Sequence, residues 1–341
     1  MKEIIVNSNQ ANQRFDKLLK KVLNEANSSF IYKMLRKKNI LLNDKKSSGN
    51  EMLIVGDVIK IYLSDETFSK FSTAKYNAAV LPPSEIKNFN KLIIYEDNNV
   101  ILLNKPLGML SQKAKNEDVS INELMIEYLL FKNEISTETL KTFKPSICNR
   151  LDRNTTGIII GGKSLFGLQQ MNKMLKNREL SKFYIALIKG RIETNGYIKG
   201  YINKDEQNNK VSISTYENST NNSLIETSYI PICSSHDYTL LKVHLITGKT
   251  HQIRAHLSSI GHPIIGDYKY GDNTLNNFFK LHYNIKSQLL HSFELEFKTL
   301  GGELEVLSKK KFIAELPEYF KNVIGDIEWQ HGTPEDLEGL L

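Results

Sequence analysis

The sequence predicts an α+β protein in which a small basic N-terminal module precedes a larger, β-rich domain. Its 341 residues are more than one ordinary domain needs and are enough for two or three, each with its own core. The composition, 40% hydrophobic and 24% charged, is that of an ordinary globular protein and excludes disorder, collagen and coiled coil for the whole chain. Helical and strand patterns alternate along the chain without forming repeats. These observations together favour a mixed fold.

Residues 1–63 read in the order helix, helix, strand, strand. Residues 15–23 carry apolar side chains at helical spacing, which predicts an amphipathic helix with one buried stripe. A second helix follows, capped by Ser28 or Ser29, and strands are expected at 39–43 and 58–63. The basic side chains expected on the exposed helix faces are Arg14, Lys17, Lys21, Lys33, Arg36 and Lys37.

The positive charge of the chain is concentrated in this first segment. Residues 1–63 hold twelve Lys and Arg against six Asp and Glu, whereas the net charge of the whole chain is +7. A basic module on a nearly neutral body suggests contact with a polyanion such as nucleic acid. Charge alone is equally compatible with a solvated basic face.

The same residues resemble the small alpha-L RNA-binding module first seen in ribosomal protein S-four. The resemblance lies in an R-x-D-K-x-L run from Arg14, an S-x-x-x-x-K-M-L-R-K run from Ser28 and the GDVI run from Gly56. It implies that the module contacts RNA through shape and backbone phosphates more than through base edges. The RNA-contacting residues that it implies are Arg14, Lys17, Lys33, Arg36 and Lys37.

Three further segments complete the expected organisation. Residues 64–90 have weak periodicity and contain Pro82 and Pro83, so they are expected to form a linker. The next domain is expected to span 91–324 and to begin with a hairpin that turns at residues 97–99. Residues 325–341 contain five acidic and no basic side chains, which predicts a mobile acidic tail.

The run CNRLDRNTTGIIIGGKS, from Cys148, places Asp152 between Leu151 and a polar turn that leads into a buried strand. A carboxylate this close to a core must be paired, hydrogen-bonded or protonated. The alternative is an Asp that only braces its own turn. Gly157–Ser164 also matches the phosphate-loop expression G-x-x-x-x-G-K-[ST], but three consecutive isoleucines favour a strand over a phosphate nest, so no nucleotide cofactor is expected.

Two more clusters carry candidate functional residues. A strand at 182–190 would place Lys182 and Tyr184 on one face, where a tyrosine ordinarily just packs. Residues 247–271 predict a turn followed by a short helix at 251–259, and this helix surrounds Arg254 with polar side chains. The alternative is an exposed arginine on a short helix. No metal site is expected there, because the two histidines of this helix are five residues apart and no cysteine is near.

Taken together, four segments resemble the RluA-type pseudouridine synthases. In chain order they are NKPLGML from Asn104, RLDRNTTG from Arg150, KFYIALIKG from Lys182 and TGKTHQIRAHLSSIGHPIIGD from Thr247. The resemblance implies a catalytic domain with a central, mostly antiparallel or mixed sheet flanked by helices. The chain departs from the family pattern at Asn149, where His or Cys is usual before R-L-D, and at TTG, where TSG is commoner.

The resemblance also implies roles for particular residues. Asp152 would be the catalytic carboxylate, Tyr184 the residue that faces the uracil ring and helps to remove a ring proton, and Arg254 the partner of Asp152. An opposite charge within ~4–6 Å would keep a buried Asp152 ionised. Arg150 would fill the space vacated by an extruded base. The remaining implied substrate-binding residues are Lys182, Thr250, His251 and Gln252.

The implied reaction is the isomerisation of uridine in RNA, which needs no redox step and therefore no cofactor. The alpha-L-like module and the basic N-terminus suggest large-subunit rRNA as the substrate, and tRNA is the alternative. A different class of function is a catalytically silent RNA-binding factor in ribosome assembly, but such a factor has no need of Asp152, Tyr184 and Arg254. We expect the protein to be cytoplasmic, because the sequence has no secretory signal and no apolar stretch long enough for a membrane span. A monomer is expected by default.

Overall fold

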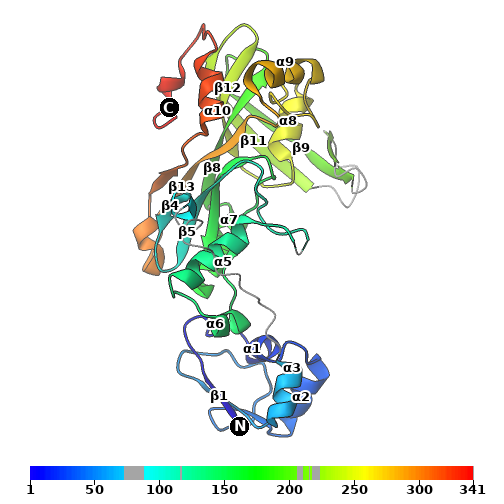
Figure 1. Cartoon of the computed structure of the whole chain (residues 1–341), viewed down its shortest axis with the longest axis vertical. Coiled ribbons are helices and arrows are strands. Elements are labelled where there is room, and N and C mark those ends of the chain that lie inside the picture. The colour runs from blue at the N-terminus through cyan, green and yellow to red at the C-terminus, as the bar shows by residue number, and fades with distance from the viewer. Residues whose placement is uncertain (73–87, 116, 206–209, 215, 217–222, 341) are drawn as a thin grey trace.

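The computed structural model describes residues 1–72, 88–115, 117–205, 210–214, 216 and 223–340. A small N-terminal module lies at one end of the long axis and a larger body fills the rest (Figure 1). The C-terminus lies on the body, near the opposite end. Both parts combine helices with strands, so the predicted α+β class is confirmed.

The module packs two helices against a three-stranded antiparallel sheet of order β1-β3-β2. The predicted order of two helices and two strands is correct, but the first strand was missed, and Asn27 caps the second helix instead of Ser28 or Ser29. Asn27 Oδ1 accepts a hydrogen bond from Phe30 N. The elements are β1 (Lys2–Ile5), α1 (Phe15–Val22), α2 (Ser28–Arg36), β2 (Ile40–Leu42) and β3 (Val58–Ile61).

The stretch expected to be a linker is partly helical. Helix α3 (Asp65–Phe71) is capped by Ser64, whose side chain accepts from Thr67 N. Phe68 and Phe71 of this helix pack against the core of the module. The module therefore extends to the end of α3. The proline pair at 82–83 lies outside the described residues.

The module also contacts the body directly. Asn9 Oδ1 accepts a hydrogen bond of 3.0 Å from Leu165 N, and Gln10 Nε2 donates one of 3.0 Å to Thr142 Oγ1. Leu165 begins helix α7 (Leu165–Asn177), so a side chain of the module satisfies one of the free amides at that helix start. These bonds give the two parts a defined interface.

The body is built around one mixed sheet of eleven strands. Nine of them follow the order β10-β9-β11-β12-β8-β13-β7-β5-β4, with β14 paired to β13 and β6 to β7. The pair β13–β7 is parallel and the others are antiparallel, as the resemblance implied. The bounds are β4 (Ile93–Glu96), β5 (Val100–Lys105), β6 (Ser146–Ile147), β7 (Thr156–Gly162), β8 (Leu180–Lys189), β9 (Gly196–Asp205), β10 (Lys210–Ser214), β11 (Ser223–Ser234), β12 (Tyr238–Leu245), β13 (Leu290–Phe297) and β14 (Lys311–Ile313).

Both faces of this sheet are buried in its middle. In β7, Ile159 points to the core under one face, while Ile158 and Ile160 point to the core under the other. The triple isoleucine is therefore part of a strand buried on both sides, and the predicted buried strand is confirmed. In β8, Tyr184 belongs to the first face and Ile185 to the second, as the alternation predicted.

Helices cover the two faces. Helix α5 (Ile121–Phe131) and helix α8 (Gln252–Ser259) pack on the face that carries Tyr184, with Met125, Leu129 and Leu257 fully buried. The other face is covered by α7, by α9 (Asn273–Tyr283) and by α10 (Glu318–Gly325). The remaining short helices are α6 (Thr137–Thr142), η1 (Gly302–Leu307) and η2 (Pro334–Asp336).

The acidic C-terminal segment is packed, which contradicts the expectation of a mobile tail. The amides of Gln330 and His331 donate to Ser234 O, and Ser234 N donates to His331 O at 2.8 Å. Leu340 is 1% exposed within the core that includes α10, and Trp329 packs against the same core. Charge counting missed this because the few apolar side chains of the segment, not its carboxylates, decide where it lies.

Within the described residues, no helix has both the length and the apolar character needed to cross a bilayer.

Candidate active site

A large cleft of the body opens on the face that carries Tyr184, between the loop before β7 and the start of α8. Its volume is about 1430 Å³. Sequence segments more than 100 residues apart meet in it. Eight of the predicted site residues line it: Arg150, Asp152, Lys182, Tyr184, Thr250, His251, Gln252 and Arg254.

The loop that carries Asp152 is held by hydrogen bonds on both sides of that residue. Ser111 Oγ donates to Leu151 O at 2.7 Å and accepts from Leu151 N at 3.0 Å, and Thr155 N donates to Asp152 O at 3.0 Å. Asn149, the departure from the family pattern, bonds through its side chain with the backbone of Ile158 and Ile160 in β7. The loop is therefore fixed to the sheet, and Asn149 contributes to that fixation.

Lys105 also stabilises this loop, although it was not among the predicted site residues. Its ammonium group is fully buried at the end of β5 and donates to the carbonyls of Pro106, Met109 and Arg153 at 2.9–3.1 Å. Burial lowers the pKa of Lys105 to about 8, while the negative charge of Asp152 acts to raise it. The signal for this residue was the NKP run, in which a lysine ends an otherwise apolar strand.

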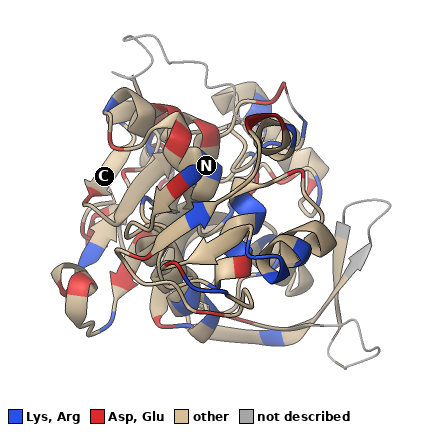
Figure 2. Cartoon of the chain, turned by 90° about the horizontal axis from the view of Figure 1, so that it is seen from below, with Lys and Arg blue, Asp and Glu red and all other residues tan. Residues whose placement is uncertain are grey.

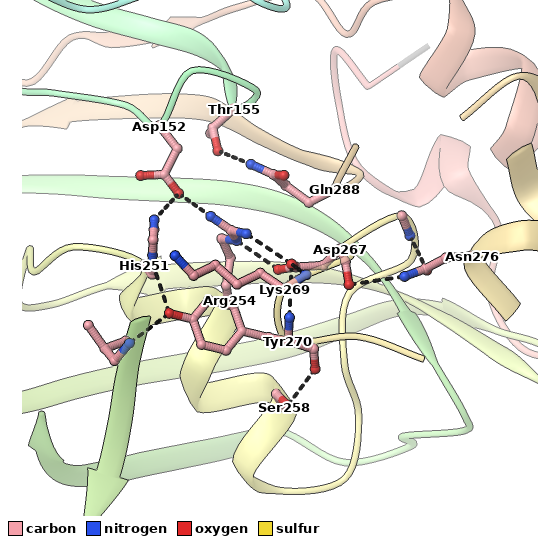
Figure 3. A network of polar contacts seen from close by, with 12 residues as sticks. Asp152, Thr155, His251, Arg254, Ser258, Asp267, Lys269, Tyr270, Asn276 and Gln288 are labelled. Atoms are coloured by element: carbon pink, nitrogen blue, oxygen red, sulfur yellow. Dashed lines mark hydrogen bonds and ion pairs between the residues drawn. The ribbon is translucent and has the colours of Figure 1, made fainter. Parts of the chain in front are cut away.

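Arg254 lies between two carboxylates (Figure 3). Its Nε and Nη2 atoms donate to Asp267 Oδ2 and Oδ1 at 2.7 and 2.9 Å, and its Nη1 donates to Asp152 Oδ2 at 2.8 Å. Burial by itself lowers the pKa of Arg254, but the hydrogen bonds and charges of Asp267 and Asp152 raise it above its ordinary value. The guanidinium group stays charged and bridges the two carboxylates.

Asp267 is the second residue that the sequence analysis missed. It is 1% exposed, and its Oδ1 also accepts from the amides of Lys269 and Tyr270. Burial acts to raise the pKa of Asp267, but Arg254 and these amides hold it below its usual range. A carboxylate thirteen residues after Arg254, in a Gly/Pro-rich turn, was the available signal. Asp267 fixes the orientation of the arginine, and the arginine then fixes Asp152.

Tyr184 forms part of the cleft floor at the middle of β8. The side chain is 5% exposed and hydrogen-bonds with Ser292 of the adjacent strand β13. Burial raises the pKa of Tyr184 to about 12, and the charge of Asp152 adds to that effect. The phenol is therefore neutral at ordinary pH and presents a ring surface.

Two of the predicted residues at the start of α8, Gln252 and His251, make different contacts. Gln252 uses its amide within the protein: Nε2 donates to Glu226 O and Thr227 Oγ1, and Oε1 accepts from Lys249 N and Thr247 Oγ1. These four bonds occupy the donors and acceptors of the Gln252 amide. The side chain therefore stabilises the loop and does not contact a substrate. His251 faces Asp152, with Nε2 3.8 Å from Asp152 Oδ2.

The other predicted residues of the cleft carry positive or polar groups to its walls. Arg150 and Thr250 are exposed, and Lys182 is half-buried, which lowers the pKa of its ammonium group. The five predicted RNA-contacting residues of the module do not line the cleft: Arg14, Lys17, Lys33, Arg36 and Lys37 are all exposed on the module instead. Figure 2 views the chain from that end and shows Lys and Arg interspersed with Asp and Glu.

In the part of the chain that the structure describes, no three His, Cys, Asp or Glu side chains gather closely enough to hold a metal ion.

Comparison with known proteins gives a consistent result. The family model described as RNA pseudouridylate synthase matches residues 99–259, a range that contains Asp152, Tyr184 and Arg254. An uncharacterized RNA pseudouridine synthase of Mycoplasma capricolum is 31% identical over 317 residues, which cover 92% of this chain and 97% of that protein. The ribosomal large subunit pseudouridine synthase D of Borreliella burgdorferi is 32% identical, with 81% of this chain and 79% of that protein covered.

A solved structure supports the fold separately. The human protein titled RNA pseudouridylate synthase domain containing 4 superposes with a TM-score of 0.57 at 21% identity, and the match covers 73% of this chain and 98% of the human one. At this identity the superposition speaks for the fold alone. Sequence identity over most of the chain, together with the matching fold, shows that this chain belongs to the family of RNA pseudouridine synthases.

Proposed function

We propose that this chain isomerises uridines of large-subunit rRNA, with Asp152 as the catalytic residue. The observation that carries the proposal is the ion pair of Asp152 with Arg254, 2.8 Å long, in the same cleft as the ring of Tyr184. Relatives named ribosomal large subunit pseudouridine synthase D and C support rRNA as the substrate class. The Asp152 side chain is 27% exposed, which leaves it accessible to a nucleotide.

The two oxygens of Asp152 have different surroundings, and this difference suggests which one reacts. Oδ2 accepts from Arg254 and faces His251, whereas no described residue forms a hydrogen bond or an ion pair with Oδ1 (Figure 3). We assign the reaction to Oδ1. It either attacks the sugar or the ring, or removes a sugar proton to begin an elimination.

In each route the same bonds change. The bond between C1′ of the ribose and N1 of the uracil breaks, the uracil turns, and a bond forms between C1′ and C5. A proton leaves C5 and one is gained at N1, so the product is an isomer of the substrate. Because the pKa of Tyr184 is raised to about 12, the neutral phenol is a poor base, and we assign the C5 proton to the Asp152 carboxylate once it is free again.

Two other residues complete the proposed site. The buried Tyr184 ring would hold the uracil while it turns, since stacking on an aromatic ring does not depend on one fixed orientation of the base. The exposed Arg150, at the mouth of the cleft, would occupy the stack from which the uridine was extruded. Arg254 is a positioning residue in this scheme, because it acts through Asp152.

The module is proposed to hold the RNA outside the cleft. Its five candidate residues are exposed and basic, and its hydrogen bonds to α7 and α6 give it a defined place relative to the body. Phosphate contacts of this kind position the RNA without reading its sequence.

The test uses in vitro transcribed large-subunit rRNA and tRNA, incubated with the full chain and mapped chemically for pseudouridine. Wild type should modify rRNA. Asp152→Asn should bind the RNA with unchanged affinity and give no product, a loss of at least ~10³-fold in single-turnover rate. The control is Asp237→Asn, an exposed aspartate outside the cleft, which should keep the wild-type rate. Product from tRNA alone would overturn the substrate class, and turnover by Asp152→Asn would overturn the assigned residue.

A further inference from the structure

His251 occupies an unusual backbone position next to the proposed catalytic carboxylate. It precedes α8 as the N-cap residue, with φ 55° in the left-handed region, yet its side chain makes no capping hydrogen bond. Non-glycine residues adopt this conformation at a cost, and only when their surroundings enforce it. Here the conformation turns the imidazole away from the helix start and places it between Asp152 and Tyr270.

The hydrogen bonds around Tyr270 favour one tautomer of this imidazole. Val211 N donates to the Tyr270 hydroxyl oxygen at 2.9 Å, so that oxygen is an acceptor there. With that position taken, a hydroxyl proton directed to His251 Nδ1, 2.9 Å away, gives the contact between the two side chains its donor. A neutral imidazole that accepts at Nδ1 carries its proton at Nε2.

The proton at Nε2 points towards the catalytic carboxylate. Nε2 lies 3.8 Å from Asp152 Oδ2, the same oxygen that accepts from Arg254 Nη1. Four charged groups face the imidazole: Asp152, Arg254, Asp267 and Lys269. Burial lowers the pKa of His251 and the positive charges of Arg254 and Lys269 act in the same direction, while the two aspartates oppose them, so the ring is neutral at ordinary pH.

We propose that His251 is a positioning residue whose Nε2–H group, oriented by Tyr270, holds Asp152 Oδ2 in place and leaves Oδ1 to react. The inference rests on the proposed function and adds a named partner to it. At 3.8 Å the contact is longer than a hydrogen bond, and a shift of less than 1 Å, of the kind that accompanies substrate binding, closes it. Tyr270 also lies over the guanidinium group of Arg254, 5.2 Å from the ring centroid, so one side chain orients both donors to Asp152.

The first experiment separates positioning from RNA contact. His251→Leu removes the N–H donor, whereas His251→Gln restores an N–H group near the position of Nε2 without titrating. We expect the single-turnover rate to fall by about tenfold in the leucine variant and to recover to within about threefold of wild type in the glutamine variant, with the RNA affinity unchanged in both. The matched control is His262→Leu, which alters an exposed histidine outside the cleft.

Two outcomes of this experiment would overturn the inference. Weaker RNA binding with an unchanged rate constant would make His251 an RNA contact. Equal rates in the leucine and glutamine variants would show that the N–H group is not what matters.

A second measurement does not depend on activity. In the full chain labelled with ¹⁵N at its eight histidines, the His251 signal, assigned by its absence in His251→Gln, should show an unprotonated Nδ1 and a protonated Nε2. Tyr270→Phe should move this signal towards a mixture of tautomers and lower the rate by a few-fold. The control is Tyr268→Phe, which should change neither the signal nor the rate, because Tyr268 is partly exposed and bonded to Asn276 O. A proton at Nδ1 in wild type would refute the inference. If wild type makes no pseudouridine while the spectrum is as expected, the proposed function fails and the assigned geometry stands.

Discussion

The module and the body each contain an arginine that forms a two-pronged ion pair with a buried aspartate. In the module, Arg14 donates to both oxygens of Asp16, two residues away, at 3.0 and 3.2 Å. In the body, Arg254 does the same with Asp267, thirteen residues away, at 2.7 and 2.9 Å. The two aspartates are almost equally buried, 3% and 1% exposed.

The difference between the two pairs lies in the arginine. The Arg14 side chain is 45% exposed, and its Nη2 atom also donates to the exposed Asn50, so the pair fastens the start of α1 to a neighbouring turn. The Arg254 side chain is 9% exposed, and its Nη1 atom donates to Asp152 in the cleft. The same pairing stabilises a local helix start in the first case and orients the proposed catalytic carboxylate in the second. Burial of the cation accompanies this difference, since a buried charge needs a charged or hydrogen-bonding partner.

The largest expected effect follows from removing the carboxylate that holds Arg254. Asp267→Asn leaves that buried guanidinium group with one charged partner, so we expect the free energy of unfolding to fall by about 3–5 kcal/mol and the single-turnover rate by about 10²-fold or more. Asp16→Asn, the matched change in the module, should destabilise the module and leave the rate at saturating RNA within about threefold. Denaturant unfolding and single-turnover assays measure both. A wild-type rate in Asp267→Asn would show that Arg254 does not need Asp267 to orient Asp152.

A change of pH should also affect the stability of the two regions differently. All eight histidines lie beyond residue 235, and burial lowers the pKa of both His256 and His291 to about 4. The unfolded chain takes up protons at these side chains near pH 6.5, whereas the folded body does not until about pH 4. Each of these histidines therefore makes its full contribution to the free energy of unfolding above pH 6.5. That contribution, roughly 3 kcal/mol for each histidine, is lost as the pH falls towards 4.

Hydrogen exchange of the full chain at pH 7 and pH 5 measures this difference. After correction for the intrinsic exchange rate, amides of β7, β8 and β13 should lose protection at pH 5, while amides of α1 and α2 should change much less. His291→Gln should reduce the loss in the body. Equal loss in the module and the body would show that the histidines are not its cause.

The smallest expected effect concerns the exposed charges of the module. Replacing Lys33 and Arg36 of α2 together with Lys37, which follows the helix, by alanine should weaken RNA binding by about tenfold at low salt and lower the slope of log K against log salt by about 2, because fewer counterions are released. The rate at saturating RNA should not change. The matched variant replaces Lys309, Lys310 and Lys311, basic residues of the body that do not line the cleft, and should leave the slope as in wild type. An unchanged slope in the α2 variant would show that this helix is not an RNA anchor.

Local pattern was sufficient to predict many of the elements. The apolar spacing of residues 15–23 predicted α1, the three consecutive isoleucines predicted β7, and the alternation in KFYIALIKG predicted β8 and the position of Tyr184 on one of its faces. These features depend on contacts within a few residues, so the sequence carries them directly. The strand β1 and the helix α3 were missed because each is short and is stabilised by packing against residues elsewhere in the module.

The sequence by itself determined which residue types are available for chemistry: a carboxylate in R-L-D, a tyrosine in a strand, and an arginine among histidines. Only the tertiary structure decided how they are joined. Asp267 and Lys105 give no periodic signal, yet one orients Arg254 and the other ties down the loop of Asp152. The physical reason is that a buried charge takes its partners from whatever the fold places within about 3 Å, irrespective of separation along the chain.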